Sequence, residues 1–176
     1  MKLILTFLLC TTLTDLYSQS PGFCKYIDTI NGFSIEIPAG WYYGVNKDMP
    51  TIKLSALRKT TDTLDRHHEN FNLNIMKVKN SSLELEYAKL IEAISDPGSL
   101  GIIKKGDVFL NGQPYKWLIE KHKSYIDSSI EMTDEMFLTY KNEKTYILTF
   151  DTFSKEFNKY ETLFTKISNT LIILDK

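Results

Sequence analysis

The chain has 176 residues, 43% of them hydrophobic, and a formal net charge of −1 at pH 7. Its 21 basic residues are balanced by 22 acidic ones and are spread along the sequence, which excludes a basic surface for nucleic acid. With two cysteines the protein cannot be a disulfide-built scaffold, so its stability has to come from a hydrophobic core.

The first residues are typical of an export signal. Lys2 supplies a positive charge, residues 3–9 form an apolar run, and small and polar residues follow at 18–20. The apolar run is shorter than the roughly 20 residues of a membrane-spanning helix. We therefore expect a cleaved signal peptide over 1–19 and a flexible leader over 20–25. The mature protein is then periplasmic or secreted and has no transmembrane segment.

The two cysteines suggest one alternative. Cys10 ends the apolar run, which is where a lipoprotein carries its lipid, but the bulky residues before it differ from a lipoprotein signal. A membrane-tethered envelope lipoprotein is kept as an alternative. Cys24 is the one cysteine left after cleavage at 19, so we expect it to be an unpaired thiol near the new N-terminus.

Residues 33–41 carry the clearest strand pattern in the chain. Apolar and polar side chains alternate up to Pro38, which has no N–H to continue a ladder. Gly40 then permits a tight bend, and Trp41 is expected to pack against the end of the sheet. Three further segments in the first half of the chain either alternate apolar and polar residues or lie beside a hairpin turn signal. The strands predicted here are 25–30, 33–37, 51–57 and 71–75.

A helix is predicted to follow these strands. Ser81 and Glu84 form a capping box, in which each side chain satisfies a free backbone N–H of the other's residue. Apolar residues from Leu83 to Ile94 recur at helical spacing on one face. An Asp-Pro-Gly sequence at 96–98 ends the helix.

The second half is predicted to contain four strands and a final helix. Asn111-Gly112 is a strong signal for a tight hairpin, and a polar turn is expected at 141–144. Ser154 is expected to cap the final helix, whose apolar stripe needs a sheet face to cover it. The predicted strands are 101–110, 113–125, 130–140 and 145–150, and the stripe consists of Phe157, Tyr160, Phe164, Ile167 and Leu171.

These elements predict the fold class. Strands joined by hairpins favour an antiparallel sheet, whereas a parallel sheet needs a helix between most of its strands. Helices set against an antiparallel sheet define the α+β class. We predict a single domain over 26–174, with an antiparallel sheet of about six to eight strands flanked by helices as an α/β/α sandwich.

The strand 33–37 with its Pro38–Trp41 ending resembles the opening strand of the PsbP-like superfamily. This superfamily includes the photosystem II protein PsbP, a Ran-binding nuclear import factor and bacterial DcrB-like envelope proteins. The hairpin at 111–112 and the final strand and helix over 145–171 are similar to its central hairpin and closing elements. The resemblance implies an α/β/α sandwich and a role in binding or assembly, with partners that differ between branches.

His67 and His68 are the sharpest candidates for metal chemistry. They lie in a polar stretch with several carboxylates, and imidazole with carboxylate can bind Zn²⁺. Neighbouring residues of an extended chain point to opposite sides, so a solvated loop is the competing interpretation. His122, the remaining histidine, is far away in sequence.

Four aromatic residues are candidates for a partner or ligand surface. Trp41, Tyr42 and Tyr43 follow the first clear strand, and Trp117 lies in the second half. Aromatic rings with a polar group suit binding sites, although such rings also close the ends of sheets. We predict that these four residues contribute to a binding surface.

No pattern in the sequence indicates catalysis. There is no Gly-x-Ser-x-Gly elbow, and the adjacent carboxylates Asp134 and Glu135 should face opposite sides of their strand. We predict a non-catalytic binding or accessory protein without a cofactor, which engages a protein partner in the cell envelope or outside the cell. A metal-binding protein or metal-dependent enzyme that uses His67 and His68 is the alternative. The partner's identity and the oligomeric state do not follow from the sequence.

Overall fold

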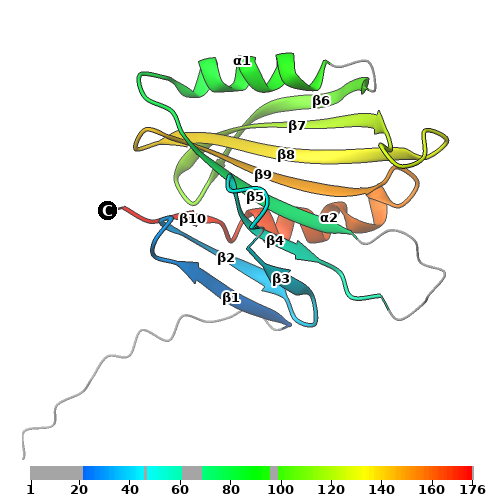
Figure 1. The fold of residues 1–176 in the computed structure, drawn as a ribbon, viewed down its shortest axis with the longest axis horizontal. Helices are drawn as coiled ribbons and strands as arrows, with labels where there is room; N and C mark the ends of the chain where they lie inside the picture. The colour runs from blue at the N-terminus through cyan, green and yellow to red at the C-terminus, as the bar shows by residue number, and fades with distance from the viewer. Residues whose placement is uncertain (1–21, 46, 61–68, 96–98, 176) are drawn as a thin grey trace, which may run out of the picture.

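A computed structural model describes residues 22–45, 47–60, 69–95 and 99–175. The predicted signal peptide, with Cys10, lies outside these residues. Within them the chain forms ten strands and two helices (Figure 1). The strands are β1 (Phe23–Asp28), β2 (Phe33–Pro38), β3 (Tyr42–Gly44), β4 (Ile52–Leu57), β5 (Asn70–Lys77), β6 (Ser99–Leu110), β7 (Gln113–Lys123), β8 (Glu131–Lys141), β9 (Lys144–Phe153) and β10 (Ile172–Ile173). The helices are α1 (Leu83–Ile94) and α2 (Phe157–Ser168).

The strands form two antiparallel sheets, which confirms the predicted α+β class. The larger sheet has seven strands in the order β3-β4-β5-β9-β8-β7-β6, and the smaller has three in the order β1-β2-β10. The strand over 33–37 that was predicted from alternation is therefore the central strand of a small second sheet. Its pairing with β10 brings the C-terminal segment back to the first hairpin.

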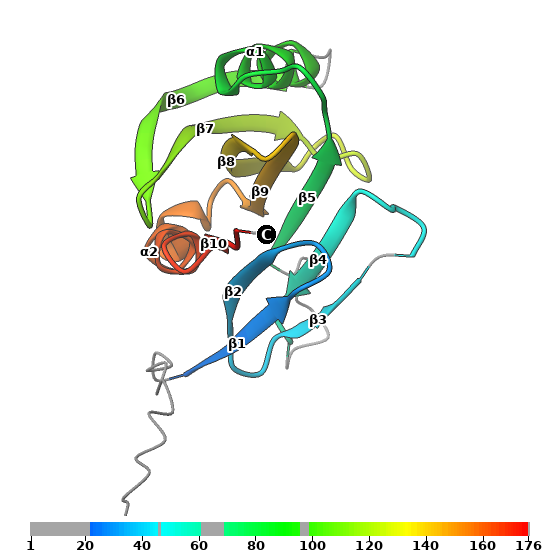
Figure 2. The ribbon, with the colours of Figure 1, turned by 90° about the vertical axis from the view of Figure 1, so that its left-hand side faces the viewer.

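The larger sheet curves around α2 and β10, and the small sheet closes the open side (Figure 2). We call the concave face, which α2 contacts, the inner face, and the opposite face, where α1 contacts β7 and β8, the outer face. A helix on each face of the sheet gives the predicted sandwich, with the small sheet added to the inner layer.

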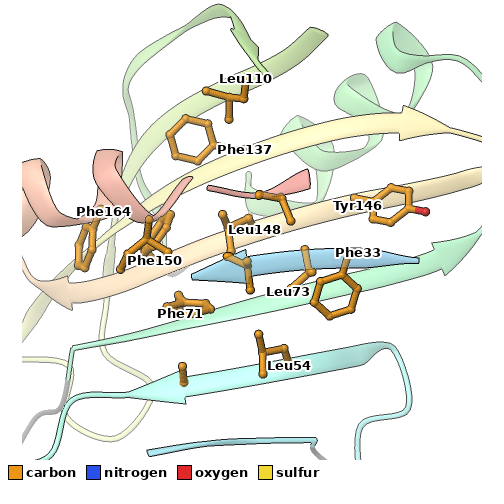
Figure 3. Close-up of a cluster of buried hydrophobic side chains, with 14 of the residues drawn as sticks. Phe33, Leu54, Phe71, Leu73, Leu110, Phe137, Tyr146, Leu148, Phe150 and Phe164 are labelled. Atoms are coloured by element: carbon orange, nitrogen blue, oxygen red, sulfur yellow. The ribbon is translucent and has the colours of Figure 1, made fainter. Parts of the chain in front are cut away.

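The hydrophobic core lies on the inner face, between the two sheets and α2 (Figure 3). Phe150 is fully buried, and its ring stacks on that of Phe164 from α2 with 4.8 Å between their centroids. Phe71 of β5 also contacts the ring of Phe150, with 5.7 Å between the centroids. The predicted stripe of α2 is thus covered by the sheet, and truncation of any one of these rings would cost about 3–5 kcal/mol.

The N-terminal caps of both helices differ from the predictions. Ser82, one residue after the predicted cap, accepts a hydrogen bond from the N–H of Leu85 and begins α1. Ser81 instead donates its hydroxyl to Glu86, the buried residue of this helix. Ser154 does not cap α2, because its hydroxyl lies 2.8 Å from that of Thr133, and the cap position is taken by Glu156.

Turn geometry explains the hairpins of the second half. Asn111 and Gly112 both have positive φ, at 50° and 75°, as the Asn-Gly signal predicted for a tight hairpin. Asn142 and Glu143 also have positive φ, at 52° and 56°, and join β8 to β9. These tight turns fix which residues lie opposite each other on neighbouring strands.

The first strand begins three residues before the predicted domain boundary, at Phe23. Cys24 therefore lies within β1, opposite Ile37, and is an exposed free cysteine. In the described part of the chain, neither helix has the length and apolar character needed to cross a membrane.

Candidate functional site

The predicted aromatic surface begins at β3, the edge strand of the larger sheet. The side chains of Tyr42 and Tyr43 are 55% and 53% exposed. Two more large apolar residues, Val45 and Met49, are exposed just after the strand. We call these four residues the aromatic end of the sheet. Several exposed apolar side chains in one segment are typical of a contact surface.

Contacts with neighbouring elements hold this segment in place. The ring of Tyr43 meets that of Tyr26 from β1 edge-on, with 5.9 Å between centroids, so β3 is tied to the small sheet. The ammonium of Lys59 lies over the ring of Tyr42. Trp41 is half-buried and packs against the core residue Phe71, at 6.2 Å. Trp41 thus anchors the aromatic end, while the two tyrosines present it to solvent.

Trp117 does not join the other three aromatic residues. It lies on β7, and β4, β5, β9 and β8 separate that strand from β3 in the sheet. Its indole is partly buried against the core and packs over Gly106 of β6, where an added Cβ would meet Nε1 at 3.0 Å. Trp41, Tyr42 and Tyr43 are neighbours at the sheet edge, but Tyr42 and Tyr43 are consecutive residues of β3 and so project from opposite faces of it. Trp117 has a separate packing role.

His67 and His68, the candidate metal ligands, lie outside the described residues. The metal-binding alternative that depends on them stays a prediction.

A second cluster of polar side chains, on the outer face, does not follow from the sequence patterns above. Four adjacent strands place Asn70, Asp151, Asp134 and Glu120 in one cross-strand row on the outer face. His122, two residues after Glu120, projects from the same face of β7. Ligand atoms of His122, Asp134 and Asp151 lie within 4.8 Å of one another. We call His122, Asp134, Asp151 and Glu120 the histidine–carboxylate cluster.

Hydrogen bonds orient the members of this cluster. Nδ1 of His122 lies 3.0 Å from the carbonyl oxygen of Lys123, which can only accept, so Nδ1 carries a proton. Nε2 then faces Oδ1 of Asp134 across 3.5 Å. On the other side of the row, the amide of Asn70 donates to Oδ2 of Asp151.

The pKa values in the cluster are shifted because several carboxylates lie close together where little water reaches them. Burial, with Asp134 adding to it and His122 opposing it, raises the pKa of Glu120 to about 7. The contact with Asp134 raises the pKa of His122 to about 9 despite its burial. The cluster therefore attracts positive charge, which His122 supplies as a proton when nothing else is bound.

Glu135, the neighbour of Asp134, faces the opposite side of the sheet, as predicted for adjacent residues of a strand. It is buried on the inner face, and this burial, together with the charge of Glu161, raises its pKa to about 7 against the opposing effect of Lys104. Asp134 and Glu135 therefore belong to different environments and cannot act as a pair of converging carboxylates.

Comparisons with known proteins place this architecture among solved structures. No protein-family model matches the sequence, and no curated protein is similar to it in sequence. The structure is similar to that of the cyanobacterial PsbP protein, CyanoP, from Synechocystis, with a TM-score of 0.63 and 14% sequence identity. That match covers 89% of this chain and 95% of CyanoP.

Two other bacterial proteins have a similar structure. Protein PA94 of Pseudomonas aeruginosa, described as a putative regulator of unknown function, matches with a TM-score of 0.58 and 14% identity over 88% of this chain and 99% of its own. LpqN of Mycobacterium tuberculosis, which is involved in cell envelope biogenesis, matches with a TM-score of 0.58 and 12% identity over 90% and 88%. At these identities the likeness concerns the fold. The chain has the PsbP-like fold that its opening strand and closing helix predicted.

Proposed function

We propose that this protein is a non-catalytic accessory protein that binds a protein partner through the aromatic end of its larger sheet. One observation carries the proposal: Tyr42 and Tyr43, next to each other on an edge strand, are both more than half exposed. Tyrosine is enriched in protein interfaces because its ring supplies contact area and its hydroxyl a hydrogen bond.

The position of β3 supports a protein rather than a small molecule as the partner. Among the residues that the structure describes, β3 is the terminal strand of the sheet and pairs with β4 alone. A strand added by a partner would pair with the other edge of β3, and the tyrosine side chains would then contact the partner's side chains. An extended segment of another protein satisfies both requirements.

The place of action is proposed on different grounds. Residues 1–19 have the pattern of a cleaved export signal, which favours the periplasm or the exterior of the cell. LpqN, which shares the fold, is involved in cell envelope biogenesis. Mass spectrometry of the mature N-terminus tests this part: a start near residue 20 supports export of a free protein, and a lipid on Cys10 would support the lipoprotein alternative instead.

The binding surface can be tested by site-specific crosslinking in the native host. A photo-reactive amino acid at position 43 is compared with one at position 109, because Phe109 is also an exposed aromatic residue, 72% accessible, at the tip of the β6–β7 hairpin. We expect a discrete crosslinked protein from position 43 and none of that mass from position 109.

The same experiment is repeated with a Tyr42→Ala change beside the crosslinker. Loss of the crosslinked product with an unchanged melting temperature supports the aromatic end as the contact. Equal crosslinking from both positions, or none from position 43, would contradict the proposal.

A further inference from the structure

The outer face holds buried carboxylates that no cation among the described side chains fully neutralises. Glu120 is 5% exposed, and its carboxylate makes no hydrogen bond to any side chain that the structure describes. Oδ1 of Asp134 is buried and makes no hydrogen bond in that part of the chain; its charged neighbour there is His122, whose Nε2 lies 3.5 Å away. Buried carboxylates without partners are costly, so a native fold that keeps them calls for an explanation.

The surroundings increase this cost. Along β8, Asp134 lies between Met132 and Met136, which are 5% and 7% exposed and project from the same face. Directly opposite Asp134 on the neighbouring strands are Glu120 and Asp151. Among the described residues, Asp134 therefore lies between two carboxylates with His122 close by, and a cation bound there would reduce the repulsion between them.

We propose that His122, Asp134 and Asp151, with Glu120 beside them, bind a divalent transition-metal ion such as Zn²⁺ on the outer face of the larger sheet. This site is separate from the aromatic end and does not depend on the proposed partner. It also differs from the predicted alternative, because it uses neither His67 nor His68.

The geometry fits such an ion. Ligands that bind Zn²⁺ tetrahedrally at about 2.1 Å lie roughly 3.4 Å from each other. The distance from Nε2 of His122 to Oδ1 of Asp134 is 3.5 Å, and the ligand atoms of the set of three all lie within 4.8 Å of one another.

The ligands also have the supporting contacts that metal ligands need. Because the Lys123 carbonyl accepts from Nδ1 of His122, the lone pair of the neutral ring is on Nε2, which faces the carboxylates. The side-chain amide of Asn70 donates to Asp151, and its oxygen accepts a hydrogen bond from the amide of Asn72. The oxygen of Asn72 in turn accepts from the hydroxyl of Ser55. This chain of hydrogen bonds fixes the amide of Asn70 with its donor side toward Asp151.

The donor set indicates the class of ion. Mg²⁺ and Ca²⁺ bind oxygen ligands, whereas an imidazole nitrogen together with carboxylates suits Zn²⁺ and Mn²⁺. His122 and Asp134 keep 13% and 14% of their side-chain surface accessible, so an ion can reach them from solvent. The site is therefore assigned to a transition metal rather than to an alkaline-earth ion.

The test is a calorimetric titration of the chelator-treated full chain with Zn²⁺, and separately with Mn²⁺, Ca²⁺ and Mg²⁺. We expect one equivalent of Zn²⁺ to bind and to raise the melting temperature. Asp134→Asn and Asp151→Asn should each weaken Zn²⁺ binding at least about tenfold. Glu131→Gln is the matched control, an exposed carboxylate on the same strand as Asp134, and should leave the affinity within about twofold.

Melting temperatures measured in the presence of chelator show whether each variant is folded. If one aspartate variant fails to fold, the Zn²⁺ affinity of the other still tests the proposal. The proposal is overturned if the unmutated chain binds no Zn²⁺, or if neither aspartate variant weakens binding. Loss of binding in a His67→Ala/His68→Ala variant alone would assign the ion to the other stretch. Binding of Ca²⁺ or Mg²⁺ as tight as that of Zn²⁺ would contradict the class of ion.

Discussion

Two glutamates on the outer face of the same sheet are equally buried and have opposite electrostatic environments. Glu86 of α1 and Glu120 of β7 are each 5% exposed. Glu86 accepts hydrogen bonds from Lys89, Ser81 and Thr145, at 2.6, 2.5 and 2.9 Å. The carboxylate of Glu120 accepts none from the described side chains and lies opposite the carboxylate of Asp134, with His122 as its one favourable charged neighbour.

The pKa values of the two glutamates differ accordingly. Burial by itself raises the pKa of Glu86, but the hydrogen bonds from Lys89, Ser81 and Thr145 outweigh it and lower the pKa below its ordinary value. The pKa of Glu120 is raised to about 7 by burial and by Asp134. A buried acid whose oxygens are fully hydrogen-bonded stabilises the fold, whereas a buried acid without hydrogen-bond donors is typical of a binding site.

The largest effect is expected from Glu86→Ala. This change leaves the hydroxyl of Thr145 buried without its acceptor and removes the link between α1 and β9. The full cost of breaking a buried ion pair is reduced because the side chain of Lys89 is 53% exposed and can be solvated. We expect a loss of about 2–3 kcal/mol in the free energy of unfolding, measured in urea at pH 7.

Glu92→Ala is the matched control for this prediction, since Glu92 is an exposed acid on the same helix. It should change the free energy of unfolding by less than about 0.5 kcal/mol. Equal losses in both variants would mean that helix propensity rather than the buried hydrogen bonds is being measured.

The next effect concerns pH. Because the folded-state pKa of Glu86 is lower than its unfolded value, the folded protein binds fewer protons in that range, and stability rises with pH. The contribution of Glu86 is therefore complete above its ordinary pKa of 4.5 and is lost as the pH falls through the lower folded-state value. Urea unfolding of the unmutated chain and of Glu86→Gln between pH 7 and pH 3 should show the two stabilities converging on the acid side. A constant difference across that range would show that the ionised carboxylate contributes nothing.

The fold was largely predictable, because its determinants are local. Alternation located most strands, and the stripe of α2 required a covering sheet. The small second sheet was not predicted, since the pairing of β10 with β2 joins residues almost at opposite ends of the chain. Nor was the cap of α1, because Ser81 and Ser82 are chemically equivalent and the choice depends on the hydrogen bond from Ser81 to Glu86.

Part of the histidine–carboxylate cluster was within reach of the sequence. The predicted turn at 141–144 pairs Lys141 with Lys144. Counting the same number of residues away from the turn, backward along β8 and forward along β9, places Asp134 opposite Asp151. The position of Glu120 and His122 could not be derived in this way. The segment between β7 and β8 is longer, so its length does not fix the register of those strands.

The smallest expected effect has the opposite sign and completes the comparison. Glu120→Gln removes a carboxylate that lies opposite Asp134, at little change in shape, so repulsion in the cluster decreases. We expect the metal-free protein, measured in chelator by urea unfolding at pH 7, to become about 0.5–1 kcal/mol more stable. Glu131→Gln, at an exposed position on β8, should have no measurable effect. With Zn²⁺ present the sign should reverse, because the same substitution then removes a negative charge beside the bound ion. A residue that destabilises the protein alone and stabilises it with an ion is retained for binding, whereas Glu86 stabilises the fold in both conditions. Suppose instead that, in the presence of chelator, Glu120→Gln destabilises the protein as much as Glu86→Ala does. Both glutamates would then have a structural role, and Glu120 would not be part of an ion site.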